Sequence, residues 1–357
     1  MTDAATALPA RPADGPFDRT PSLPPGRLLL TAAITLAVVL GGYEAALRAR
    51  GCFASVANTD ALWAAHYNAL PSGAASREAV AIIGASRMQI GIDLPSMQAA
   101  WPDRSLHQLA MTSRRSPARV LQHLAEETDF AGTVIASTVL RFQRGAGFDA
   151  QTDLLATATE STSWTAGPDA RMAAWCQSRA ACLQSRYGWR PLLAELARGR
   201  FIAGPQPPWR AMDLQRQIRL DASAASEQRL AKLTDALKPT AYETPADIAS
   251  LAEQFPQMAA WAAAIEARGG HVWFVRLPIQ PERIAIELEL FPTVEDWSRL
   301  EAALAAGGVD PSRAIDCWSV APLADFAPPD GSHLDIAESP AFTRLLVEEM
   351  NRRAGRE

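Results

Sequence analysis

The stretch "AIIGASRMQIGID", residues 81–93, changes character halfway along its length. A short apolar, β-branched run, Ala79 to Ile83, ends in two small residues, and Ser86 and Arg87 then bring in polarity. Such a run predicts a buried strand followed by a turn into a helix. A side chain at that turn lies above the carboxyl edge of the sheet, where open α/β sheets place their ligands. The stretch is therefore either a plain strand-to-helix turn or a turn that carries a nucleophile.

Strand-like and helical segments alternate from residue 79 onward. The expected strands are 79–83, 105–110, 133–140, 271–277 and 313–318. The expected helices are 116–127, 248–268, 294–306 and 336–353, and 94–101 is a short helix or a loop. This alternation predicts an α/β fold of three layers, in which a mostly parallel sheet has helices on both faces.

One region departs from this alternation. Residues 144 to about 245 contain several helical runs and no convincing strand, so we expect a helical insertion there. The insertion carries four tryptophans: Trp164, Trp175, Trp189 and Trp209. These rings either fasten the insertion to the rest of the domain or stack on sugar rings.

The N-terminus contains a candidate membrane anchor. Residues 1–26 are rich in proline and are expected to be disordered. Leu28 to Tyr43 carries no charge, and the run 27–48 reaches the length of a transmembrane helix, roughly 20 residues. A buried core helix and a cleaved signal peptide, with a poor cleavage site at 55–57, are the alternatives. The long polar lead favours an uncleaved anchor followed by one α/β domain, 49–357.

The flanks of this span leave its orientation open. Arginines occur on both sides of it, at 11, 19 and 27 before and at 48 and 50 after, so the positive-inside rule gives almost no preference. Cys176 and Cys182 lie in one segment, "WCQSRAAC", where a disulfide is permitted outside the cytoplasm. Two unpaired thiols fit the segment equally well.

Composition excludes several classes of function. The net charge of −5 gives no basic character that would indicate nucleic-acid binding. None of the five histidines has a second histidine at ligand spacing, so we expect no metal site. No glycine-rich phosphate loop is present, which argues against a cytoplasmic nucleotide-binding protein.

A second chemical motif lies near the other end of the chain. The loop "APPDGSHLD", residues 327–335, places Asp330 three residues before His333. That spacing lets the carboxylate fold back on the imidazole, fix its tautomer and stabilise the imidazolium. Serine is a weak nucleophile that needs such a base, and the amides at the start of a helix favour any anion formed beside Ser86. The loop is therefore a candidate for a base with its orienting carboxylate.

The pairing of "IIGASRMQIGID" with "DGSHLD" resembles the SGNH (GDSL-like) hydrolase superfamily. In particular, it resembles membrane-anchored bacterial members associated with acylation of cell-surface polysaccharides. The resemblance covers about residues 79–143 and 248–350. It implies an SGNH, flavodoxin-like fold in which Ser86 is the nucleophile and Asp330 and His333 complete the triad. It also implies that no cofactor is needed.

The chain departs from this family's pattern in three places. The aspartate expected before the nucleophile is Ala85, the second-block glycine is missing from "LAMTSRRSP", and the third-block asparagine is missing from "VLRFQRG". Losing one oxyanion donor costs roughly 3 kcal/mol of transition-state stabilisation. The remaining candidates for oxyanion or substrate contacts are Arg87, Thr112, Ser113, Gln143 and Arg276. The alternative for the two arginines is an ion pair with a nearby carboxylate.

The expected protein is a single-pass protein of the inner membrane whose α/β domain faces the extracytoplasmic side. The expected activity is that of an O-acyl esterase or O-acyltransferase on an acylated cell-envelope polysaccharide or exopolysaccharide. A multi-pass membrane acyltransferase is the expected protein partner. The alternative is a non-catalytic binding or scaffold protein of an envelope polymer assembly. The missing asparagine and glycine favour that alternative, and the complete Ser, Asp and His set opposes it.

Overall fold

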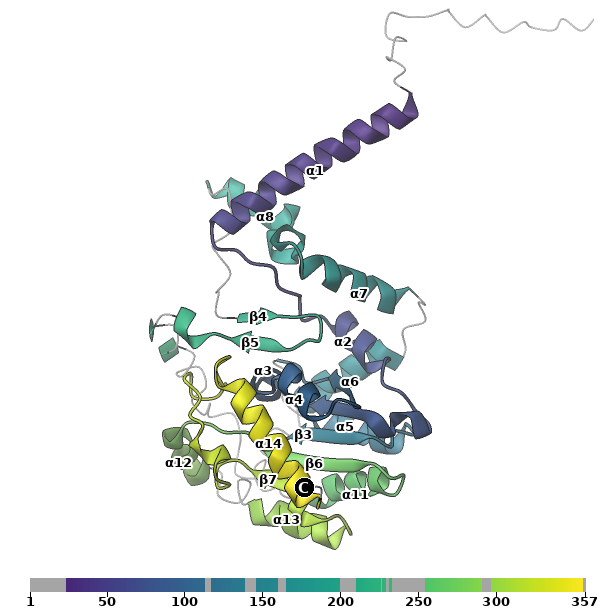
Figure 1. Cartoon of the computed structure of the whole chain (residues 1–357), viewed down its shortest axis with the longest axis vertical. Helices are drawn as coiled ribbons and strands as arrows, with labels where there is room; N and C mark the ends of the chain where they lie inside the picture. The colour runs from purple at the N-terminus through teal and green to yellow at the C-terminus, as the bar shows by residue number, and fades with distance from the viewer. Residues whose placement is uncertain are drawn as a thin grey trace, which may run out of the picture. The chain divides into compact units, whose positions relative to one another are not determined.

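The computed structural model describes most of the chain (Figure 1). The described residues are 24–112, 117–138, 146–159, 165–199, 210–225, 227–228, 231–232, 254–290 and 297–355. The chain divides into two compact units, Met1–Ala46 and Leu47–Glu357. The described part of the first unit belongs almost entirely to one helix, and the second unit contains the sheet.

Helix α1, Pro25–Ala49, is the N-terminal apolar helix. The stretch Gly26–Ala49 is long and apolar enough to cross a membrane, and none of its most apolar window is buried inside the protein. Its side chains are open to the surroundings, with Leu29 70% and Val38 69% exposed. A buried core helix does not fit this exposure. The expected disordered tail lies almost wholly outside the described residues.

The central sheet has five strands: β1 (Ala79–Ile83), β2 (Ser105–Gln108), β3 (Thr133–Ser137), β6 (His271–Arg276) and β7 (Ala314–Asp316). Their order is β2-β1-β3-β6-β7, and all four pairings are parallel. Every residue of β1 and β3 is buried, because helices cover both faces of a parallel sheet. The predicted α/β fold with a parallel sheet is confirmed.

Two cores lie on opposite faces of the sheet, because successive strand side chains point to opposite sides. Ala81 and Ile83 of β1 face one core, and Val80 and Ile82 face the other. Helices on the first side are α2 (Asp60–Tyr67), α5 (Ala118–Glu126), α6 (Ala146–Thr159), α11 (Phe255–Glu266) and α13 (Trp297–Ala306). Helices on the second side are α3 (Ser86–Gly91), α4 (Leu94–Ala100) and α14 (Ser339–Arg353). The sheet therefore forms the middle of three layers, with helices on both of its faces.

The expected helical insertion also contains a β-hairpin, so the prediction that it holds no strand is wrong. After α7 (Ala166–Gln177) and α8 (Trp189–Ala197), strands β4 (Arg210–Met212) and β5 (Ile218–Leu220) pair antiparallel. Each strand is only three residues long, which is too short to show a period of two in sequence. Arg216, in the connecting turn, adopts φ 65°, a conformation that non-glycine residues rarely take.

The remaining elements are short or were not expected from sequence. Helix α12 (Pro281–Leu290) follows β6. The 3-10 helices are η1 (Gly73–Glu78), η3 (Ala181–Leu183), η4 (Ser185–Tyr187), η5 (Ala222–Ala224), η6 (Pro311–Arg313) and η7 (Leu323–Asp325).

The sequence left two questions open in the insertion: whether its cysteines form a disulfide bond, and what its tryptophans contact. Cys176 and Cys182 form no disulfide bond in this structure. Trp175 is 49% exposed and lies beneath the Arg179 guanidinium, 5.2 Å from ring centroid to Cζ. Trp164, Trp209 and the side chain of Trp189 lie outside the described residues.

Candidate active site

The turn after β1 presents Ser86 at the carboxyl edge of the sheet. Gly84 adopts φ +150°, and a Cβ added there would lie 2.7 Å from the Cβ of Ser137 on β3. Only glycine fits this close approach of the two strand ends. Ala85 then has extended backbone as the N-cap of α3, and Ser86 is the first residue of that helix. The sharp turn therefore leaves the serine side chain half-buried at the edge rather than inside the core.

The triad residues predicted from sequence lie in hydrogen-bonding contact. The Nε2 atom of His333 lies 2.9 Å from Oγ of Ser86, within the reach of about 2.6–3.2 Å that a general base needs. The Nδ1 atom of His333 lies 2.8 Å from Oδ2 of Asp330. With the ring proton on Nδ1, the imidazole donates to Asp330 and accepts from the Ser86 hydroxyl. Segments 247 residues apart in sequence thus form one continuous hydrogen-bonded chain.

Asp330 is held as an anion behind the imidazole. Its residue is only 1% exposed, and burial acting alone raises the pKa of the carboxyl group. The ring and charge of His333 and the amides of His333 and Ser332 outweigh burial, so the pKa is lowered overall. Those two amides donate to Oδ1 at 2.7 and 3.0 Å. The carboxylate is therefore ionised at neutral pH and oriented by the backbone of its own loop.

The loop that carries Asp330 and His333 is braced from the segment after β6. The amide of Gln280 donates to the carbonyl of Gly331 at 3.4 Å. Gly331 itself has φ 86°, which a residue with a side chain rarely adopts. The tight turn at Gly331 is what allows both backbone amides beyond it to converge on one carboxylate oxygen.

Arg87 braces the same loop from α3. Its side chain is buried, and its Nε donates to Oγ of Ser332 at 2.8 Å. Its Nη2 lies 3.6 Å from Oε1 of Glu287 on α12, which also accepts from Nε of Arg283 at 2.7 Å. The carboxylate pairing considered from sequence therefore holds for Arg87. Arg87 thus ties α3 to the loop that carries His333.

Arg276, the second arginine candidate, belongs to a different ion pair. It is buried at the end of β6, and its Nε and Nη2 both donate to the carboxylate of Asp316 on β7. Its guanidinium carbon lies 4.0 Å from the ring centroid of Trp318 and 4.9 Å from that of Trp297. These contacts hold β7 beside β6, so pairing with a carboxylate accounts for this arginine too.

The backbone beyond β2 is occupied by structural hydrogen bonds. The amides of residues 110–112 donate, in order, to Oε1 of Gln108, to the carbonyl of Gly84 and to Oε1 of Gln89, at 3.0, 3.0 and 2.8 Å. The hydroxyl of Thr112 also donates to Oε1 of Gln89, at 2.8 Å. These three amides are therefore committed within the protein and do not point to an oxyanion.

The start of α3 is the described part of the site with backbone donors suited to an oxyanion. No side-chain hydrogen bond caps this helix. Its first amides lie next to Ser86, the nucleophile expected from the resemblance, and amides in that position can stabilise the charge of a tetrahedral intermediate. The candidates Ser113 and Gln143 lie outside the described residues.

A buried polar network that was not expected from sequence lies beside α3. Gln89 is fully buried, and its Nε2 donates to the carbonyl of Arg216 at 3.0 Å. Arg216 is also fully buried and donates to the carbonyl of Gln108 at 2.6 Å and to Oδ1 of Asn58 at 2.8 Å. The network joins α3, the end of β2 and the hairpin turn. The position of Gln89 between the apolar residues Met88 and Ile90 was the one available signal.

The charge of Arg216 is stabilised mainly by neutral acceptors. Burial lowers the pKa of its guanidinium to about 9, and the charge of Asp60 acts in the opposite direction. Carbonyl and amide oxygens accept its hydrogen bonds, as described above. Such an arrangement fixes the position of the arginine, because removing any one acceptor leaves a buried cation short of partners.

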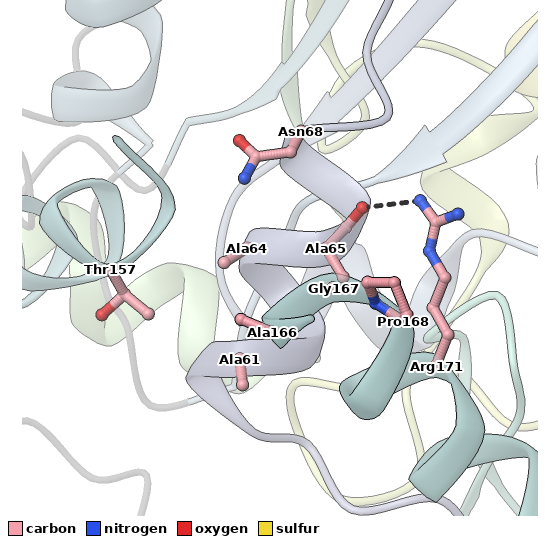
Figure 2. A pocket seen from close by; sticks show the side chains of 9 residues that line it. All are labelled: Ala61, Ala64, Ala65, Asn68, Thr157, Ala166, Gly167, Pro168 and Arg171. Carbon is pink, nitrogen blue, oxygen red and sulfur yellow. Dashed lines mark hydrogen bonds between the residues drawn. The ribbon is translucent and has the colours of Figure 1, made fainter. Parts of the chain in front are cut away.

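Two cavities lined by described residues do not include the triad in their linings. The larger, about 480 Å³, lies between α2, the end of α6 and the start of α7 (Figure 2). Its lining is Ala61, Ala64, Ala65, Asn68, Thr157, Ala166, Gly167, Pro168 and Arg171. Nη2 of Arg171 donates to the carbonyl of Ala65 at 2.9 Å. The smaller, about 220 Å³, lies between α2, the end of α5 and Phe130. Neither is lined by Ser86 or His333.

The described residues contain no cluster of three or more His, Cys, Asp or Glu side chains that could hold a metal ion. Comparison of this chain with protein-family models, with curated proteins and with solved structures finds no match. The site is therefore defined by its own geometry: a serine, an imidazole and a buried carboxylate in hydrogen-bonded series at the carboxyl edge of a parallel sheet.

Proposed function

We propose that the chain is a membrane-anchored serine O-acyl esterase or O-acyltransferase of the SGNH type. The single observation that carries the proposal is the hydrogen-bonded series Ser86, His333 and Asp330. Its three members have distinct environments suited to nucleophile, base and orienting anion. The serine is half-buried at the sheet edge, whereas the carboxylate is almost fully buried behind the ring.

In the proposed reaction, Oγ of Ser86 attacks the acyl carbonyl carbon while Nε2 of His333 takes the hydroxyl proton. The carboxylate of Asp330 stabilises the imidazolium and keeps its own charge. The tetrahedral intermediate then expels the alcohol, which receives the proton from Nε2, and an acyl-serine ester remains. Water or a sugar hydroxyl then attacks the acyl carbon and gives its proton to Nε2 of His333. Oγ of Ser86 leaves and takes that proton back. The product is then a free acid or a new ester.

The oxyanion is proposed to lie against the first amides of α3. The family's other donors are absent here, and the amides of residues 110–112 are already committed. One oxyanion donor is worth about 10²- to 10³-fold in turnover. We therefore expect a slower enzyme than a member of the family with its full set of donors.

The proposed polymer substrate and cellular location are supported by helix α1 and by the resemblance of the two motifs to SGNH members. Helix α1 is apolar enough to cross a membrane, which supports a single-pass anchor. The resemblance of the two motifs to membrane-anchored SGNH members supports an acylated envelope polysaccharide or exopolysaccharide as substrate. It also supports an extracytoplasmic domain on the inner membrane and a multi-pass acyltransferase as partner.

A non-catalytic scaffold or binding protein of an envelope polymer assembly is the second candidate. The specific observation that favours it is the occupied backbone beyond β2, where the family places a donor. A scaffold would keep the triad as a structural relic or as a binding surface for the polymer.

A covalent probe separates the two candidates. The full chain, purified in detergent, is treated with a fluorophosphonate, which a triad serine attacks with loss of fluoride. We expect one phosphonyl group on Ser86 by peptide mass spectrometry, and none in His333→Ala. The control is Ser185→Ala, which removes an exposed serine of η4 and should leave the labelling unchanged. Absence of labelling in the folded wild-type chain would support the scaffold.

A further inference from the structure

Exposed apolar side chains outside α1 gather in one segment of the chain. Of the eight large hydrophobic residues that are exposed in the described part beyond α1, five lie between residues 172 and 196. They are Met172 (62%), Trp175 (49%), Leu183 (44%), Leu193 (55%) and Leu196 (44%). The first two share one face of α7 and the last two share one face of α8, because residues three apart are neighbours on a helix. We name residues 166–199 the α7–α8 segment.

The α7–α8 segment is also basic, although the whole chain is acidic. It contains five arginines, at 171, 179, 186, 190 and 198, and two acidic residues, Asp169 and Glu195, whereas the chain carries a net charge of −5. Two of these arginines lie over aromatic rings, Arg179 over Trp175 and Arg186 over Tyr187. Exposed apolar and aromatic side chains mixed with arginines are typical of surfaces that lie in the headgroup region of a bilayer.

Hydrogen bonds tie this segment to the residues that directly follow the membrane-spanning candidate. Helix α1 ends at Ala49, and Nη2 of Arg48 in its last turn donates to the carbonyl of Arg179 at 3.1 Å. Further along, Nε2 of Gln184 donates to the carbonyl of Phe53 at 2.7 Å. If α1 crosses a bilayer, its last turn lies at the membrane surface, and Arg179 lies within one arginine side chain of it.

The exposed face of α7 is held outward by the body of the domain. Ala174 of α7 is buried against the hairpin and the N-terminal segment, and Arg171 is bonded to the carbonyl of Ala65 on α2 (Figure 2). The amide of Ala57 donates to Oε1 of Gln177 at 2.8 Å, which fixes the end of the helix. Because one face of α7 is anchored in this way, Met172 and Trp175 cannot turn inward to bury themselves.

We propose that the α7–α8 segment lies in the headgroup region of the bilayer that α1 crosses. The exposed apolar side chains insert at the boundary with the acyl chains, and the arginines contact lipid phosphates. The proposal rests on α1 as a membrane span and is independent of the acyl chemistry. Anionic lipid fits this surface better than a second copy of the chain, because two copies would bring surfaces of like charge together.

Photo-crosslinking to lipid tests the proposal on the full chain. The protein is reconstituted in vesicles of equal parts phosphatidylcholine and phosphatidylglycerol that contain a photoactivatable lipid, and crosslinked peptides are mapped by mass spectrometry. We expect crosslinks in α1 and in the α7–α8 segment. Helix α12 is the internal control: it exposes Ile286 (41%) and Leu288 (44%) but carries three glutamates and one arginine, so it should not crosslink.

Matched variants identify the contacts. Trp175→Asp combined with Leu193→Asp should reduce crosslinking of the α7–α8 segment about tenfold or more, because each substitution places a charge at an apolar boundary. The crosslinks of α1 should stay unchanged. Leu288→Asp on α12 should alter neither. Replacing phosphatidylglycerol by phosphatidylcholine, or raising salt, should weaken the segment's crosslinks.

Three results would overturn the proposal. Crosslinks confined to α1 would show that the segment stays clear of the lipid. Segment crosslinks that appear only when the protein is diluted in lipid would show that a second chain covers the segment instead. Absence of crosslinks in both regions would refute the membrane span itself. Fluorophosphonate labelling of Ser86 on the same samples reports the active site separately, so failure of one proposal is not mistaken for failure of the other.

Discussion

The ends of β1 and β2 are neighbours at one edge of the sheet, and they use their polar groups differently. At the end of β1, the chain turns sharply and leaves the Ser86 hydroxyl facing an imidazole. At the end of β2, the backbone and the hydroxyl of Thr112 are bound by Gln108 and Gln89. We propose chemistry at the first strand end, whereas the polar groups at the second are used in hydrogen bonds within the fold.

This difference explains how Ser86, His333 and Asp330 can form a hydrogen-bonded series although the neighbouring strand end departs from the SGNH pattern. The hydrogen bonds of Ser86, His333 and Asp330 depend on two short segments only. The donors that the family draws from the second strand depend on a glycine that this chain lacks, and glutamine side chains occupy the backbone there instead. Variants at the two strand ends should therefore separate turnover from stability.

The largest expected effect is on turnover at the β1 end. Ser86→Ala and His333→Ala should each reduce hydrolysis of p-nitrophenyl acetate by a similar factor, on the order of 10⁴ or more, because triad members act as a unit. Asp330→Ala should cost less. All three should keep the wild-type circular dichroism spectrum.

Steady-state kinetics of the full chain in detergent measure this effect, with Ser185→Ala as the control. A large loss in His333→Ala with wild-type turnover in Ser86→Ala would place the nucleophile elsewhere. The end of β1 would then not be the site of the reaction.

The next-largest expected effect is on stability, at Gly84 after the end of β1. Gly84→Ala places a Cβ 2.7 Å from that of Ser137 and puts a side chain at φ +150°. We expect a loss of about 3 kcal/mol in the free energy of unfolding, since overpacking and backbone strain each cost about 1–3 kcal/mol. Urea denaturation measures it.

Two further variants separate the causes of that loss. Ser137→Gly in the same chain should recover only part of it, because the strained φ remains. Gly167→Ala, where an added Cβ meets nothing within 4 Å, is the matched control and should not destabilise. Equal stability of Gly84→Ala and wild type would show that the strand ends are not packed as described.

The sequence predicts the layers from strong local signals, whereas the pairing of Ser86 with Asp330 and His333, which lie far apart in sequence, came from the resemblance to SGNH hydrolases. Buried parallel strands are continuous apolar runs, such as 79–83 and 133–137, and Asp330 and His333 lie three residues apart in a loop rich in proline and glycine. The hairpin, the Gln89–Arg216 network and α12 were missed, because each depends on contacts between distant segments. No periodicity in residues 210–220 indicates that Arg216 reaches the end of β2.

A smaller effect is expected at the β2 end. Gln89→Leu keeps the approximate volume of the side chain but removes the acceptor of the Thr112 amide and hydroxyl and the donor to the carbonyl of Arg216. Leaving such buried groups unsatisfied should lower the free energy of unfolding by about 2 kcal/mol. Turnover by the folded fraction should fall by less than a factor of about 10, because the triad is not touched. A loss of turnover as large as that of Ser86→Ala would abolish the distinction between the two ends.

The smallest effect is the pH dependence contributed by Asp330. Its pKa is lowered in the folded protein relative to an ordinary aspartate, which titrates near about 3.9, so the folded state favours the ionised form. The stabilisation is therefore fully present above the unfolded pKa and is lost as pH falls through the lower, folded pKa. Asp330→Asn keeps the size of the side chain but cannot ionise. The difference in unfolding free energy between wild type and this variant should be constant above about pH 5 and should shrink below about pH 4. Urea denaturation of both chains across that range measures the difference. A difference that grows as pH falls would mean that the carboxyl group is held in its protonated form, and it could not then stabilise an imidazolium on His333.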